Sequence, residues 1–88
     1  MKKITMFILK SCPYCIEALR HMDRLAADDS RYGALDIEII DEQERSDIAD
    51  TYDYYYVPAY YVDGEKLHEG AASLQSVRRV FDAALRER

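Results

Sequence analysis

The sequence predicts an α/β fold in which a four-stranded mixed sheet is flanked by helices. Three observations support this prediction: a run of residues 4–9 that is apolar apart from one threonine, helical spacing of the apolar residues that follow it, and an Asp63-Gly64 pair between two strand-like runs. Together with the segments between them, these three features predict the element order β-α-β-α-β-β-α. A chain of 88 residues is long enough for one domain over residues 1–88 and too short for two.

The first half of the chain predicts a strand, a helix and a second strand. Residues 4–9 are apolar apart from Thr5, as expected for a central strand covered on both faces. Residues 28–33 contain turn formers and should end the helix in a loop. Apolar and acidic residues alternate at positions 35–39, which predicts an edge strand with one solvent-exposed face. The two strands must be parallel, with a right-handed crossover. The apolar residues at helical spacing are Cys15, Ala18, Leu19, Met22, Leu25 and Ala26.

The second half predicts a short helix, a hairpin and a final helix. Asp41 and Glu44 form a capping pair for the short helix, which carries Ile48, Ala49 and Tyr52. The Asp63-Gly64 turn joins strands at residues 59–62 and 65–69. Ser73 caps the final helix, whose apolar stripe is Leu74, Val77, Val80, Phe81, Ala84 and Leu85.

The stretch Cys12-Pro13-Tyr14-Cys15 lies where the first strand turns into the first helix. Pro13 suits the first helical position, which places Cys12 at the N-cap. Unpaired backbone N–H groups and the helix dipole favour a thiolate there. Cys15 follows on the same helix face one turn later, within reach of a disulfide. The pattern predicts a dithiol switch in which Cys12 attacks and Cys15 resolves.

Charge and composition exclude several other kinds of function. The formal net charge of −5 argues against nucleic acid or an anionic membrane as the main partner, and no apolar run approaches the ~20 residues of a membrane span. No export signal is recognisable, so we expect the reducing cytoplasm, where paired cysteines are more often catalytic or metal-binding than structural. Zinc needs four ligands, and with no second CxxC or CxxH we expect no metal site; His21 and His68 are interpreted as surface residues.

A dithiol at a strand-to-helix turn inside a βαβ unit resembles the thioredoxin-like redox fold, and Cys-Pro-Tyr-Cys is similar to the motif of glutaredoxins. The resemblance implies a glutaredoxin-type fold and a thiol-disulfide oxidoreductase that acts on protein or glutathione disulfides. It implies no tightly bound cofactor, with glutathione as the reductant, and we expect a monomer. It also implies that Pro58 follows a cis peptide bond and that the Val57 backbone hydrogen-bonds a peptide-like substrate.

Four other residues are candidates for substrate binding. Lys10 precedes the dithiol, Tyr14 lies between the two cysteines, and Gly70 and Ser73 precede the final helix. Glutaredoxins carry Gly-Gly, then Cys or Ser, then Asp at this last place. This chain has Glu69 in place of the first glycine and lacks the aspartate.

Three alternatives remain open from the sequence. The first is a thioredoxin-like dithiol carrier reduced by a flavoprotein reductase, which the missing aspartate favours. The second is an iron–sulfur cluster or metal carrier that uses Cys12 of two chains, and the third is a binding module. The tyrosines of residues 52–61 have two interpretations: packing area within the fold, or an aromatic wall at Tyr55 or Tyr56 that contacts a partner.

Overall fold

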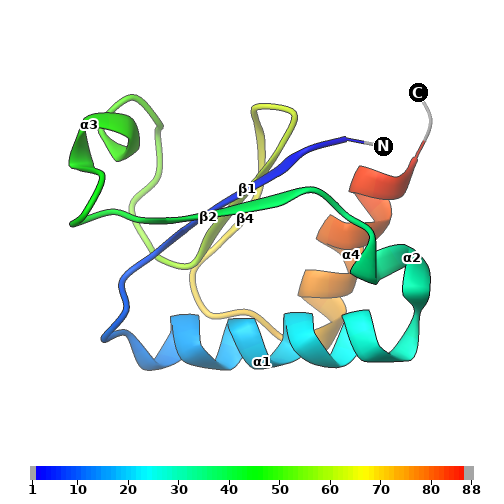
Figure 1. The fold of residues 1–88 in the computed structure, drawn as a ribbon. Coiled ribbons are helices and arrows are strands. Elements are labelled where there is room, and N and C mark those ends of the chain that lie inside the picture. The colour runs from blue at the N-terminus through cyan, green and yellow to red at the C-terminus, as the bar shows by residue number, and fades with distance from the viewer. Residues whose placement is uncertain (1, 87–88) are drawn as a thin grey trace.

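The computed structural model describes residues 2–86. Its four strands form one sheet in the order β2-β1-β3-β4, in which β1 and β2 are parallel and β3 is antiparallel to both of its neighbours. The predicted fold class, a four-stranded mixed sheet flanked by helices, is confirmed. Figure 1 shows the elements in chain order: β1 (Ile4–Ile8), α1 (Pro13–Asp28), α2 (Ser30–Gly33), β2 (Ile37–Asp41), α3 (Ser46–Ala49), β3 (Ala59–Val62), β4 (Glu65–Glu69) and α4 (Leu74–Leu85).

Helices cover both faces of the sheet, with α1 and α4 on one side and α3 on the other (Figure 1). All five side chains of the inner strand β1 are buried. Because successive side chains of a strand point to opposite faces, Met6 lies in the core beneath α1 and α4, whereas Phe7 lies in the smaller core beneath α3. This two-sided burial explains why the first strand is apolar at every position except Thr5.

The predicted helical stripes are largely confirmed. In α1, Leu19 and Ala26 are only partly buried. The residues that the two long helices bury are Cys15, Ala18, Met22, Leu25, Val77, Val80, Phe81 and Ala84. No helix within residues 2–86 has the length and apolar character needed to cross a lipid bilayer.

The predicted hairpin between β3 and β4 is also confirmed. Asp63 and Gly64 have φ values of 48° and 85°. Positive φ at both central residues is what a two-residue type I′ turn requires, and asparagine, aspartate and glycine tolerate it best. The turn therefore sets the antiparallel register of β3 against β4.

Three local predictions are wrong. The loop expected at residues 28–33 contains the short helix α2, because the carboxylate of Asp29 accepts the N–H of Arg31 and caps a new turn. Helix α3 is a single turn that begins after Arg45, and Asp41 instead binds backbone N–H groups in the turn before it. The predicted edge strand is confirmed at β2, but Ile39, which the alternation places on its dry face, is 46% exposed.

Candidate active site

The two cysteines lie at the beginning of α1, just beyond the C-terminal end of β1. Cys12 is the N-cap residue, with extended backbone, and Pro13 is the first residue of the helix. The carbonyl of Cys12 accepts the N–H groups of Cys15 and Ile16, both at 3.1 Å, so helical hydrogen bonding begins at this residue. The side chain of Cys12 makes no capping hydrogen bond. The predicted placement of the pair is confirmed.

The two thiols differ in their surroundings. Both cysteines are free; Cys12 is partly buried, whereas Cys15 is 1% exposed within the main core. Burial raises the pKa of the Cys15 thiol to about 11; the backbone of Leu9 lowers it, and the hydrogen bond and charge interaction with Cys12 raise it further. The arrangement therefore has a partly exposed outer cysteine and a buried inner thiol that keeps its proton.

The loop that enters the dithiol is held by a buried carboxylate. Oδ2 of Asp41, at the end of β2, accepts the backbone N–H of Lys10 at 3.0 Å, while Oδ1 accepts the N–H groups of Gln43 and Glu44. Burial favours a higher pKa for Asp41, but these three N–H groups outweigh it and the pKa is lowered. Sequence reasoning assigned Asp41 to a helix cap and missed its bond to Lys10.

The ammonium group of Lys10 points to a different partner. Its Nζ forms an exposed ion pair with Glu44, and hydrogen bonding to that carboxylate raises the pKa of Lys10. Glu44 therefore does not complete the predicted capping pair with Asp41. A role for Lys10 in substrate binding stays a prediction, and it would require this surface pair to open.

Val57 and Pro58 lie beside the strand that leads to the dithiol. Phe7 of β1 pairs with Ala59 of β3 in an antiparallel ladder. Continuing the ladder two residues further, forward from Phe7 and backward from Ala59, brings Val57 to the end of β1. The Val57–Pro58 peptide bond is cis, as the resemblance implied. Within residues 2–86, neither the N–H nor the C=O of Val57 makes a backbone hydrogen bond. The segment thus offers an unpaired donor and acceptor near the end of β1, the strand that leads to the cysteines.

The remaining candidate residues have clear local surroundings. Tyr14 is 57% exposed between the cysteines. Gly70 donates its N–H to the carbonyl of Pro58 at 2.9 Å and has a φ of 89°, which favours glycine. Ser73 caps α4: its Oγ accepts the N–H of Ser76 at 3.0 Å, which confirms the predicted cap and leaves the hydroxyl proton and one lone pair of Oγ for another partner. Substrate binding by these three residues stays a prediction.

In the tyrosine-rich segment, Tyr60 lies in the main core and the other tyrosines form two groups. Tyr52, Tyr54 and Tyr61 surround Phe7, with ring centroids 4.7, 5.0 and 5.8 Å from it, so packing explains them. In contrast, Tyr55 is 84% exposed and Tyr56 is 68% exposed. The exposed rings come directly before Val57.

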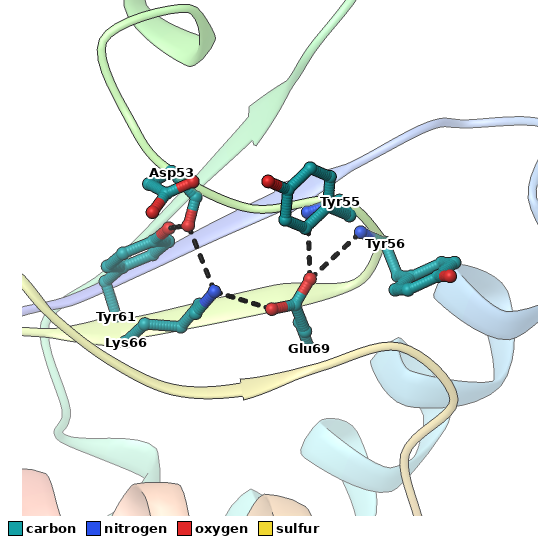
Figure 2. A network of polar contacts seen from close by, with 6 residues as sticks. All are labelled: Asp53, Tyr55, Tyr56, Tyr61, Lys66 and Glu69. Carbon is teal, nitrogen blue, oxygen red and sulfur yellow. Dashed lines mark hydrogen bonds and ion pairs between the residues drawn. The ribbon is translucent and has the colours of Figure 1, made fainter.

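Sequence reasoning missed one residue next to this segment. Glu69, noted only as an acid in place of a glycine, accepts the backbone N–H groups of both Tyr55 and Tyr56 (Figure 2). A local pattern does not reveal such a bond, because the partners are 13 and 14 residues apart in the chain. Among residues 2–86, no group of three or more His, Cys, Asp and Glu side chains is placed to hold a metal ion.

The sequence and the fold of this chain are similar to those of known proteins. The sequence profile of the family described as thioredoxin domain matches residues 2–82. A search of curated protein sequences found no significant match. Among solved structures, the chain is similar to a mutant thioredoxin from Halobacterium salinarum NRC-1, with 19% identity and a TM-score of 0.70 over 98% of this chain and 76% of that one.

A second similar structure is a protein disulfide oxidoreductase from Aeropyrum pernix K1. It shares 28% identity and a TM-score of 0.68 over 94% of this chain, which spans 37% of that protein. A third is thioredoxin 1 from Thermosipho africanus TCF52B, with 18% identity and a TM-score of 0.60 over 96% of this chain and 99% of that one. The profile match and the shared fold agree with the strand order and helix layers described above.

Proposed function

The chain belongs to the thioredoxin domain family, and from this we propose that it is a thiol-disulfide oxidoreductase whose redox pair is Cys12 and Cys15. The observation that carries the proposal is the asymmetry of the pair. Cys12 caps α1 with its sulfur free of helix hydrogen bonds, and Cys15 is buried one turn later in contact with it. One sulfur is available to a substrate and the other can reach only the first.

This asymmetry supports a two-step dithiol mechanism. The thiolate of Cys12 attacks one sulfur of a substrate disulfide, forms a mixed disulfide with it and releases the other sulfur as a thiolate. Cys15 then loses its proton and attacks the sulfur of Cys12, which releases the second substrate thiolate and leaves a Cys12–Cys15 disulfide. The raised pKa of Cys15 supports this order, because a protonated inner thiol does not compete for the substrate.

The unpaired backbone of Val57 supports a peptide-like substrate. An extended segment can pair with a free N–H and C=O without regard to its side chains. Protein disulfides and mixed disulfides with glutathione both present such a segment next to their sulfurs. We therefore propose both as the substrate class.

For the electron donor we propose glutathione, two molecules of which would reduce the Cys12–Cys15 disulfide and leave as glutathione disulfide. The second candidate is a flavoprotein reductase, as used by thioredoxin-like carriers. It is favoured by one observation: the oxygen of Ser73, a candidate contact for glutathione, already accepts the N–H of Ser76 in the cap of α4. The protein's own sulfurs carry the electrons, so neither candidate requires a bound cofactor.

Turnover of a disulfide substrate tests the proposal. The unaltered protein should reduce it with glutathione and glutathione reductase, Cys12→Ser should have no turnover, and the exposed neighbour variant Ser11→Ala should retain it. Turnover by Cys12→Ser would show that the proposed mechanism is wrong. If only thioredoxin reductase supports turnover of the unaltered protein, the electron donor is a flavoprotein reductase and not glutathione.

A further inference from the structure

The segment that carries Val57 lies outside the regular elements of the fold. Residues 53–57 lie within the connection between α3 and β3, and none of them makes a backbone–backbone hydrogen bond with another residue of the described chain. Side chains must therefore hold the path of this segment. That matters for the proposed function, because the direction of the Val57 N–H and C=O depends on the peptide groups before it.

Side chains of the β3–β4 hairpin supply the missing contacts (Figure 2). Tyr61 of β3 donates its hydroxyl to the carbonyl of Asp53 at 2.7 Å, and Lys66 of β4 donates to the same carbonyl at 3.1 Å. Oε2 of Glu69 accepts the N–H groups of Tyr55 at 2.8 Å and Tyr56 at 3.1 Å. The hairpin thus binds three backbone groups of the segment.

The two oxygens of Glu69 have separate partners. While Oε2 holds the two tyrosine N–H groups, Oε1 is 2.5 Å from Nζ of Lys66. The side chain of Glu69 is only 23% exposed and that of Lys66 33%, so water shields this pair less than a fully exposed one. The hydrogen bond from Lys66, and then those from Tyr55 and Tyr56, lower the pKa of Glu69 to about 2. The carboxylate is therefore ionised at any physiological pH.

Residues 69 and 70 hold the chain on both sides of Val57. The side chain of Glu69 binds the two residues before Val57, and the N–H of Gly70 binds the carbonyl of Pro58 after it. The φ of 89° at Gly70 lets the chain leave β4 in this direction. Residues at the end of β4 thus hold Tyr56 and Pro58, the two neighbours of Val57, while the N–H and C=O of Val57 itself remain free.

We propose that Glu69 is a positioning residue for substrate binding, which holds the Tyr55–Tyr56 backbone so that Val57 presents its free N–H and C=O to a disulfide-bearing peptide. This inference rests on the proposed function and deepens it. A backbone segment that is already fixed loses less conformational entropy when a substrate binds than a mobile segment does. The same bonds set the place of the two exposed tyrosine rings beside that edge.

The test compares Glu69→Ala and Glu69→Gln with Glu65→Gln, which removes the same charge from an exposed position on the same strand. We expect Glu69→Ala to raise KM for a peptide disulfide about tenfold with little change in kcat, as expected when binding alone is weakened. The rate at which iodoacetamide alkylates Cys12 should stay within about twofold, because this small reagent does not need the Val57 edge. Glu65→Gln should match the unaltered protein in every measurement.

Amide hydrogen exchange provides a readout that does not depend on activity. The Tyr55 and Tyr56 amides should exchange faster in both Glu69 variants and remain protected in Glu65→Gln. Glu69→Gln keeps the shape of the side chain and carries the test if Glu69→Ala fails to fold. An unchanged KM in a Glu69 variant would overturn this proposal alone, as would a KM increase with equal slowing of alkylation. No turnover in the unaltered protein would overturn the proposed function and this proposal with it.

Discussion

The backbone N–H of Lys10 donates to the buried carboxylate of Asp41 at 3.0 Å, which joins the loop before the dithiol to the end of the neighbouring parallel strand. The same carboxylate holds the turn at Gln43 and Glu44. One acidic side chain therefore ties together the two loops that leave β1 and β2 at the same edge of the sheet. The position of Cys12 depends on this tie, because only Ser11 separates it from Lys10.

We expect Asp41→Asn to loosen the dithiol loop. An asparagine has one acceptor oxygen where the carboxylate has two, so it cannot hold both loops. The melting temperature should fall and Cys15 should become accessible to alkylation in the folded protein. The control is Asp36→Asn, an exposed site one residue before β2, which should change neither quantity. Equal effects of the two variants would contradict the role given to Asp41.

Alkylation should distinguish the two cysteines of the unaltered protein. With limiting iodoacetamide near pH 8, peptide mass spectrometry should find label on Cys12 at least about ten times faster than on Cys15, because Cys15 is buried and its pKa is raised to about 11. In denaturant the two rates should converge. Equal labelling of both thiols in the folded protein would contradict the outer and inner assignment.

Substitution of the α4 cap should separate stability from substrate binding. Ser73→Ala removes the acceptor for the N–H of Ser76 and should lower the free energy of unfolding by about 1 kcal/mol in denaturant titrations. Ser73→Asp keeps a capping oxygen and should retain most of that stability. If Ser73→Asp is stable but shows a higher KM for glutathione, Ser73 also binds substrate; a stable variant with normal KM would leave it as a cap alone.

The buried hydroxyl of Tyr60 should contribute little to stability. Its partner is the sulfur of Met22 at 3.3 Å, a weak acceptor, so Tyr60→Phe should change the free energy of unfolding by no more than about 1 kcal/mol. Truncation of Phe81 to alanine in the same core should cost about 3–5 kcal/mol. A loss of several kcal/mol in Tyr60→Phe would show that the hydroxyl has a stronger partner than Met22.

The contribution of Glu69 to stability should disappear in acid. Its pKa in the folded protein is about 2, below the ordinary value of 4.5. A carboxyl group of this kind stabilises the fold above its ordinary pKa, and that stability is lost as the pH falls toward its folded pKa. The difference in melting temperature between the unaltered protein and Glu69→Gln should therefore be largest above pH 5 and should close between pH 4.5 and 2. A difference that stays constant over this range would exclude the ionised carboxylate as its source.

The fold could be predicted because its strongest signals are local. The nearly continuous apolar run of β1 indicates a central strand, the Asp63-Gly64 pair sets the hairpin, and Pro13 sets the beginning of α1. The missed features join distant parts of the chain. The bond between Lys10 and Asp41 spans 31 residues, and its formation depends on the packing of β1 beside β2.

The candidate site shows the same division. The placement of Cys12 and Cys15 follows from motif and helix start, so sequence reasoning found it. The bonds of Glu69 depend on how the segment after α3 passes the end of β4, which no local pattern encodes. The helix α2 was missed for a different reason, since a four-residue helix makes about one turn and is too short to show a repeating apolar pattern.

The most direct test of the dithiol mechanism is to trap its intermediate with Cys15→Ser. Without the inner thiol, the mixed disulfide formed at Cys12 cannot be resolved within the protein. Intact mass spectrometry after incubation with a peptide disulfide should show one added substrate thiol, located on Cys12 by peptide mapping and released by dithiothreitol. A Cys15→Ser protein that forms no adduct, although its Cys12 still reacts with iodoacetamide, would contradict the proposed mechanism.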